Sequence, residues 1–220
     1  MKEHYKFDKE EFRELLGKNI SSISCTEDFR YNQGATVSYQ PYYNRFEGIQ
    51  NLVLWYIKDS EHFTIKLYTV DNGRFSKIDN GQEKQSHYGL RSIGVIHNND
   101  LNFRKSGSIY LKPSGTFGIS TNNERITKIS FYQEVPKALI EESKSNYFPK
   151  FRDTTKFPDR IVMEGEEFYL VIRAEEDYDQ NLFLIVNIGY KFKTEENIHS
   201  SFTEPNSLEC ILIDEIQLDE

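Results

Sequence analysis

The chain has 220 residues, of which 27 are basic and 35 acidic, and its formal net charge is -8. This length suits one large all-β domain or two small ones, and we expect a single domain over residues 1–220. No apolar run approaches the roughly 18 residues that a membrane-spanning helix needs, so the sequence excludes a transmembrane role.

The start of the chain predicts a short amphipathic α-helix within residues 1–17. Asp8 can cap this helix, Glu11 stands three residues later, and Phe12, Leu15 and Leu16 form an apolar stripe.

The first residues are charged and lack the apolar core and cleavage site of a secretory signal, so we expect a cytoplasmic protein. The two cysteines, Cys25 and Cys210, agree with that expectation and are interpreted as ordinary buried thiols.

From Lys18 onward, runs rich in Ile, Val, Phe, Tyr and Thr alternate with turn signals such as Asp71-Asn72-Gly73 and Asp79-Asn80-Gly81. Strands are predicted at 19–25, 35–39, 49–58, 62–70, 88–97, 108–111, 116–120, 125–133, 160–163, 167–174, 182–192 and 208–213. A second helix is predicted at 137–144. Because strands do not alternate with helices, we expect a mainly β fold, an antiparallel, jelly-roll-like β-sandwich of two packed sheets.

An aromatic cluster precedes the strand that carries the only tryptophan, Trp55. Its candidate ligand-binding residues are Tyr39, Tyr42, Tyr43 and Arg45. Tyrosines beside an arginine supply large contact area with polar tips, which is typical of surfaces that bind sugars or proteins. The alternative, which we favour, is a turn whose rings fold into the core.

Two histidines match the pattern His-x-Thr/Ser-apolar. They are His62, followed by Thr64, and His199, followed by Ser201. The same pattern occurs in the 2H phosphoesterases, where paired imidazoles would act as acid and base on a phosphodiester. We keep this enzymatic hypothesis as an alternative, and ordinary surface histidines are the default interpretation.

The segment 144–160 carries five basic and two acidic residues with four aromatic rings among them. Its candidate binding residues are Lys150, Phe151 and Arg152. Rings offer faces for stacking and the cations attract phosphate or carboxylate, so this loop could hold a nucleotide, a single strand or an acidic protein. The favoured alternative is a loop that covers apolar core, with its rings packed inward and its lysines extended to water.

Asp177, Asp179 and Asn181 have the opening spacing of a calcium loop, but Leu182 stands where the loop needs glycine and Ile188 where it needs glutamate. A weak calcium contact is the only metal hypothesis, and no cofactor is expected.

The last segment, residues 194–220, contains eight of the 35 acidic residues and no lysine or arginine, so the other 27 acidic residues balance the 27 basic ones. This acidic segment favours a basic partner and disfavours binding to nucleic acid.

The sequence therefore predicts a non-catalytic protein that binds another protein, as an inhibitor or immunity-type protein does, through the acidic segment or the aromatic cluster. The alternative binding hypothesis is a carbohydrate-binding module. Residues 210–218 are similar to the closing strand of carbohydrate-binding jelly rolls, a likeness that fits many sandwich proteins and identifies no family.

Overall fold

The computed structural model describes residues 7–27, 36–40, 43–58, 61–80, 82–98, 124–137, 157–176, 179–190 and 208–219. These residues form one short helix and ten strands, and every strand pair is antiparallel, so the predicted mainly β fold is confirmed. The elements are η1 (Lys9–Leu15), β1 (Ile20–Glu27), β2 (Thr36–Gln40), β3 (Tyr43–Lys58), β4 (Glu61–Asp79), β5 (Gln82–Asn98), β6 (Lys128–Pro136), β7 (Arg160–Glu164), β8 (Phe168–Glu176), β9 (Leu182–Tyr190) and β10 (Leu208–Gln217).

The N-terminal helix lies where it was predicted, but it is a 3₁₀ helix and the expectation of an α-helix was wrong. Asp8 caps it by accepting a hydrogen bond from the backbone N–H of Glu10 at 3.0 Å. Tight 3₁₀ turns are common in helices this short. Phe12 is buried against Phe131 of β6, with ring centroids 5.1 Å apart, so the helix contributes to the core.

The ten strands are hydrogen-bonded in the order β10-β6-β7-β8-β9-β3-β4-β5, with β1 and β2 also paired to β3. The first part of β3 lies between β2 and β9, and its second part lies between β1 and β4. The single strand β3 therefore connects two groups of strands that the sequence analysis expected to form separate sheets.

A β-bulge at Gly48 accompanies this change of partners. Gly48 has a φ of +74°, and the register of β3 slips between Phe46 and Ile49 against β9. The register of β1 slips at the same level, between Thr26 and Glu27. Bulges bend and twist a strand, and a strand that changes layer commonly does so through one.

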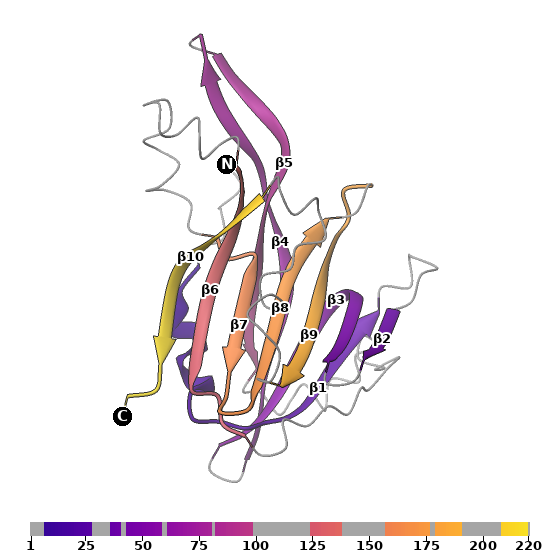
Figure 1. Cartoon of the computed structure of the whole chain (residues 1–220), viewed down its shortest axis with the longest axis vertical. Helices are drawn as coiled ribbons and strands as arrows, with labels where there is room; N and C mark the ends of the chain where they lie inside the picture. The colour runs from indigo at the N-terminus through magenta and orange to yellow at the C-terminus, as the bar shows by residue number, and fades with distance from the viewer. Residues whose placement is uncertain are drawn as a thin grey trace.

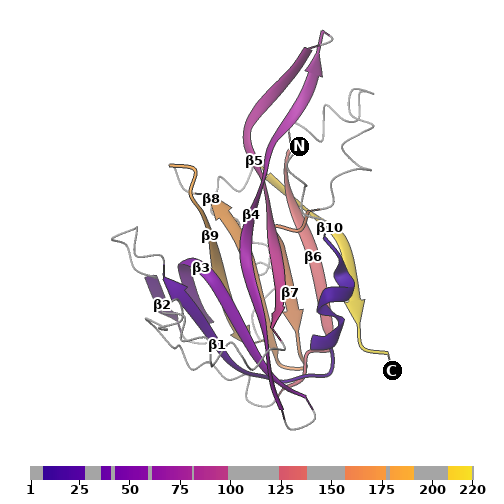
Figure 2. The ribbon, with the colours of Figure 1, turned by 180° about the vertical axis from the view of Figure 1, so that it is seen from behind.

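Figures 1 and 2 show the result, with β10, β6, β7, β8 and β9 side by side in one layer and β1, β4, β5 and the second part of β3 in the layer behind it. One buried apolar cluster includes side chains from both layers and from η1. Representative members are Phe12, Leu54, Ile65, Phe131 and Leu170. Burial of this shared apolar surface holds the layers together.

The middle of the β6–β9 layer is covered on both faces. All the residues of β8 from Phe168 to Glu175 are buried. Val162, Tyr169 and Val171 form a second small cluster apart from the main core. Charged residues of these strands are therefore buried too.

The turn predicted at Asp71-Asn72-Gly73 was wrong. Strand β4 continues through these residues to Asp79, with a slip in its register against β5 between Asp71 and Arg74. The turn signal at Asp79-Asn80-Gly81 was correct, and Asn80 has the positive φ, 52°, that tight hairpin turns need. Beyond Tyr68, where pairing with β3 ends, β4 and β5 continue together as a two-stranded arm that projects past the other strands (Figure 1).

The pairing of consecutive strands, β3-β4-β5 and β6-β7-β8-β9, does not confirm a jelly-roll. The predicted strands 108–111 and 116–120 lie outside the described residues, as does the predicted helix beyond Lys137. Among the described residues, no helix has the length and apolar character to cross a membrane.

We predict that the positive φ of Gly48, and not a lack of space, makes other residues unfavourable at this position. No atom lies within 4 Å of the position that its Cβ would occupy. Gly48→Ala should lower the free energy of unfolding by about 1–2 kcal/mol, whereas Gly48→Asn should cost less, because asparagine tolerates positive φ. Urea denaturation of the two variants checks this order, and an equal loss for both would contradict it.

Candidate functional site

The structure places three of the predicted aromatic-cluster residues on one pair of strands and Trp55 apart from them. Tyr39 lies on β2, whereas Tyr43 and Arg45 lie at the start of β3, and Trp55 lies near the far end of β3. Trp55 is half-buried and pairs with Thr64 of β4. Three of the cluster residues thus belong to one strand pair, and Trp55 is not beside them in the register. Tyr42 and the side chains of Tyr39, Tyr43 and Arg45 lie outside the described part, so the carbohydrate-binding hypothesis stays a prediction.

The enzymatic and metal hypotheses also stay predictions. His62 and Thr64 lie on β4, but His199 and Ser201 are outside the described residues. Asp179 and Asn181 precede β9, and Asp177 lies outside the described residues. The described ranges contain no group of three or more His, Cys, Asp or Glu side chains placed to hold a metal ion.

The predicted binding loop is described only at its end, where it packs inward. Lys150, Phe151 and Arg152 lie outside the described residues, but Phe157 and Pro158 are buried. The carbonyl of Pro158 accepts a hydrogen bond from Ile93 N–H of β5, at 2.9 Å. Asp159 bonds through its backbone to β6 and β8, donating to the carbonyl of Tyr132 at 3.0 Å and accepting from Ala174 N–H at 2.7 Å. This end of the loop therefore links the two layers.

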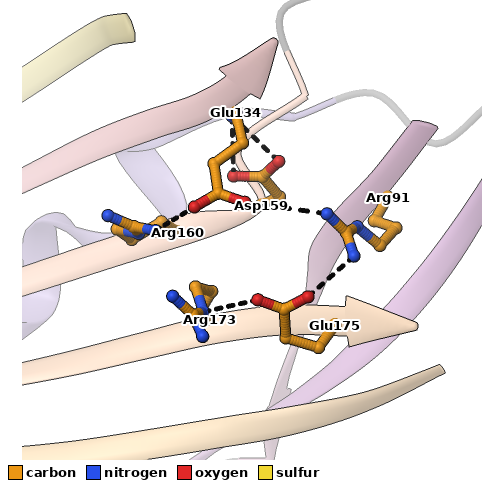
Figure 3. A network of polar contacts seen from close by, with 6 residues as sticks. All are labelled: Arg91, Glu134, Asp159, Arg160, Arg173 and Glu175. Atoms are coloured by element: carbon orange, nitrogen blue, oxygen red, sulfur yellow. Dashed lines mark hydrogen bonds and ion pairs between the residues drawn. The ribbon is translucent and has the colours of Figure 1, made fainter. Parts of the chain in front are cut away.

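Six ionisable side chains meet at this junction, and we call them the charge cluster. They are Arg91 of β5, Glu134 of β6, Asp159, Arg160 of β7, and Arg173 and Glu175 of β8 (Figure 3). Arg91 has 13% of its side chain exposed, and each of the other five residues has at most 5% exposed. Such burial requires that each charge be compensated nearby.

The charges alternate along the cluster. Arg160 forms an ion pair with Glu134, whose second oxygen lies 3.7 Å from Arg91 Nη2. Arg91 donates to Glu175 at 2.8 Å, and Glu175 lies 2.7 Å from Arg173 Nε. The cluster therefore connects strands of both layers through a chain of opposite charges.

Asp159 completes the charge cluster as its third carboxyl group. The backbone N–H of Glu134 donates to both of its carboxyl oxygens, at 3.1 and 3.0 Å. Burial, and then the neighbouring charge of Glu134, raise the pKa of Asp159 to about 8. For Arg91, burial opposes the charged form, but the attraction of Glu175, Asp159 and Glu134 prevails and raises the pKa. The charge of Asp159 therefore changes near neutral pH.

The sequence analysis did not identify the charge cluster. Its members are distant in the sequence, and Arg91 and Glu175 are 84 residues apart. A signal was present, because Arg160 begins one apolar strand, and Arg173 and Glu175 interrupt another. Charged residues inside such runs indicate buried ion pairs.

The second candidate feature is the edge of the sheet formed by residues 208–219, which we call the acidic edge. It consists of β10, which lies at one end of the strand order, and the two residues after it. Ile211, Leu212 and Leu218 are 39%, 48% and 45% exposed, and they are the only large apolar side chains exposed in the described part of the chain. Exposed apolar groups gathered on one edge favour an interaction surface.

Four acidic residues accompany these apolar groups. Asp214 pairs with Lys9 at 2.9 Å and Glu215 with Lys128 at 3.0 Å. Glu209 and Asp219 are exposed and have no ion pair within the described ranges. The edge therefore carries negative charge that its own neighbours do not fully balance.

The charge cluster lies directly beside the acidic edge. Cys210 of β10 is paired in register with Glu134 of β6. Burial raises the pKa of the Cys210 thiol to about 12, so the thiol stays protonated and unreactive near neutral pH. The ion pairs of Glu134 thus fix the strand on which β10 rests.

Comparison of the chain with protein families, curated proteins and solved structures finds no match.

We predict that the cluster is essential for stability. Glu134→Gln should lower the free energy of unfolding by about 3–5 kcal/mol, because it removes the buried carboxylate that pairs with Arg160 and lies beside Arg91. The matched control is Glu215→Gln on β10, which breaks a half-exposed ion pair and should cost less than about 1 kcal/mol. Denaturant unfolding of both variants measures the difference, and similar losses would contradict the role of the cluster.

We also predict an unusual pH dependence. The pKa of Asp159 rises from 3.8 to about 8 on folding, so the folded protein holds a proton that the unfolded chain releases. The resulting stabilisation is complete at low pH and is lost as pH rises toward 8. Asp159→Asn cannot titrate, so its stability relative to the wild type should increase between about pH 5 and pH 8. Thermal unfolding across this range checks the effect, and parallel curves for the two proteins would refute it.

Proposed function

We propose that the chain is a non-catalytic protein-binding protein whose two layers form a β-sandwich and whose acidic edge engages a basic partner protein. The observation that carries this proposal is the concentration of exposed Ile211, Leu212 and Leu218 on one acidic edge. Apolar groups at the centre of a contact supply affinity, and surrounding charges speed association and select the partner.

The surrounding construction supports a binding role. Strand β6 pairs with β10 along its length, from Leu208 opposite Pro136 to Gln217 opposite Lys128. Lys9 of η1 donates a hydrogen bond to Asp214 at 2.9 Å and so gives the acidic edge a second attachment. A surface held in this way needs little rearrangement to bind, which lowers the entropic cost of association.

The charge on the edge argues for a basic partner and against a second copy of the chain. In a symmetric pair, the same acidic patch would meet itself, and like charges placed together disfavour binding. An inhibitor or immunity-type interaction with a basic protein fits this surface.

We predict that partner binding depends on salt and on two specific carboxylates. A protein captured from the source lysate should associate several-fold more slowly as salt rises from about 50 to about 300 mM. The double variant Glu209→Gln/Asp219→Asn should associate more slowly at low salt and lose most of this salt dependence. Surface plasmon resonance with the captured protein measures both effects.

The matched control changes the same charge elsewhere on the molecule. Glu166 and Glu167 are exposed in the bend between β7 and β8, and Glu166→Gln/Glu167→Gln should bind as the wild type does. Equal behaviour of the two double variants, or association that salt does not slow, would overturn the proposed function.

A further inference from the structure

We infer that the partner binds by strand addition: a basic, extended segment of the partner pairs with the free edge of β10 and continues the sheet. This inference rests on the proposed function and specifies how the acidic edge is used.

The first argument is the direction of the exposed side chains. Ile211 pairs in register with Gln133, and Leu212 pairs with Tyr132. Because consecutive residues of a strand point to opposite faces of the sheet, Ile211 and Leu212 are exposed on different faces. A partner lying flat on one face would cover only one of them. An extended segment along the edge would contact both.

The second argument is the regular backbone at this edge. Residues Leu208 to Leu212 pair with β6 without a break, and the register slips only between Leu212 and Asp214. Within the described residues, β10 has no strand on its other side. Its outward N–H and C=O groups therefore offer a template of five regular residues, the feature that strand addition uses.

The third argument defines the chemistry of the segment. Side chains of an added strand lie beside those of β10 on the same face. The segment would place apolar residues beside Ile211 and Leu212 and a lysine or arginine beside Glu209. It therefore contains two consecutive apolar residues with a basic residue two positions from one of them.

Synthetic peptides test this arrangement on the full chain. The probe is Lys-Thr-Lys-Thr-Val-Val-Thr-Lys, and its counterpart has every lysine replaced by glutamate. Two further versions carry N-methyl groups on alternate residues, one set at odd and one at even positions. In an added strand only alternate residues bond to β10, so one N-methyl set should abolish binding and the other should leave it within a few-fold. Fluorescence anisotropy measures each affinity.

Protein variants locate the peptide. Ile211→Lys and Leu212→Lys should each weaken binding about tenfold, the effect of losing a buried contact. Glu166→Gln is the matched control, because it changes the net charge by the same amount at an exposed residue in the bend between β7 and β8, away from the acidic edge, and it should bind as the wild type does. Lysines are well tolerated on edge strands, and circular dichroism confirms that the variants fold.

Three results would overturn the inference: equal effects of both N-methyl sets, equal weakening by Glu166→Gln, or a dimer of the chain in light scattering that Ile211→Lys dissociates. If these occur while Glu209→Gln/Asp219→Asn still slows association with the natural partner, strand addition fails and the proposed function stands. If that double variant has no effect, the proposed function itself fails.

Discussion

The attraction between opposite charges in the buried cluster is the interaction on which the rest of the architecture depends. Arg91 belongs to one layer, whereas Glu134 and Glu175 belong to the other, so their contacts fix the layers relative to each other. Apolar contacts hold surfaces together without direction, but ion pairs and hydrogen bonds of this kind have defined geometry. The cluster also includes Glu134 of β6, the strand that pairs with β10. A buried electrostatic junction thus determines where the exposed edge lies.

Apolar side chains are buried in the interior but exposed at the acidic edge. Inside, Phe12 of η1 covers the core near β6, and the two layers bury the remaining apolar side chains. At the edge, apolar groups stay in water beside acidic ones. Proteins usually protect edge strands with charges and bulges, and both devices are present here, in Asp214 and in the register slip beside it. Of the five residues before the slip, only Glu209 carries such a charge, and Ile211 and Leu212 are exposed apolar residues.

Much of the fold could be predicted from the sequence, because alternating and continuous apolar runs mark strands wherever they occur. The hairpin at Asn80 was predictable from local turn chemistry. Asp71-Asn72-Gly73 was misread because its turn preference is weaker than its pairing with β5, which local sequence does not reveal. The bend at Gly48 and the ion pairs of Arg91 were missed for the same reason, since both depend on residues distant in the chain. The acidic character of the edge was evident, but its exposure required the register of β10.

The central position of β3 also shapes how the protein can form. Asn44 pairs with Ile188 of β9, a partner more than a hundred residues later in the chain. During synthesis, β3 can pair with β4 early, whereas its pairing with β9 must wait until more than a hundred further residues have left the ribosome. Contacts between such distant residues slow folding, because a long loop must close before they form. The nascent chain therefore holds a β3 without its β9 partner while these residues are made, and this interval is when a chaperone would matter most.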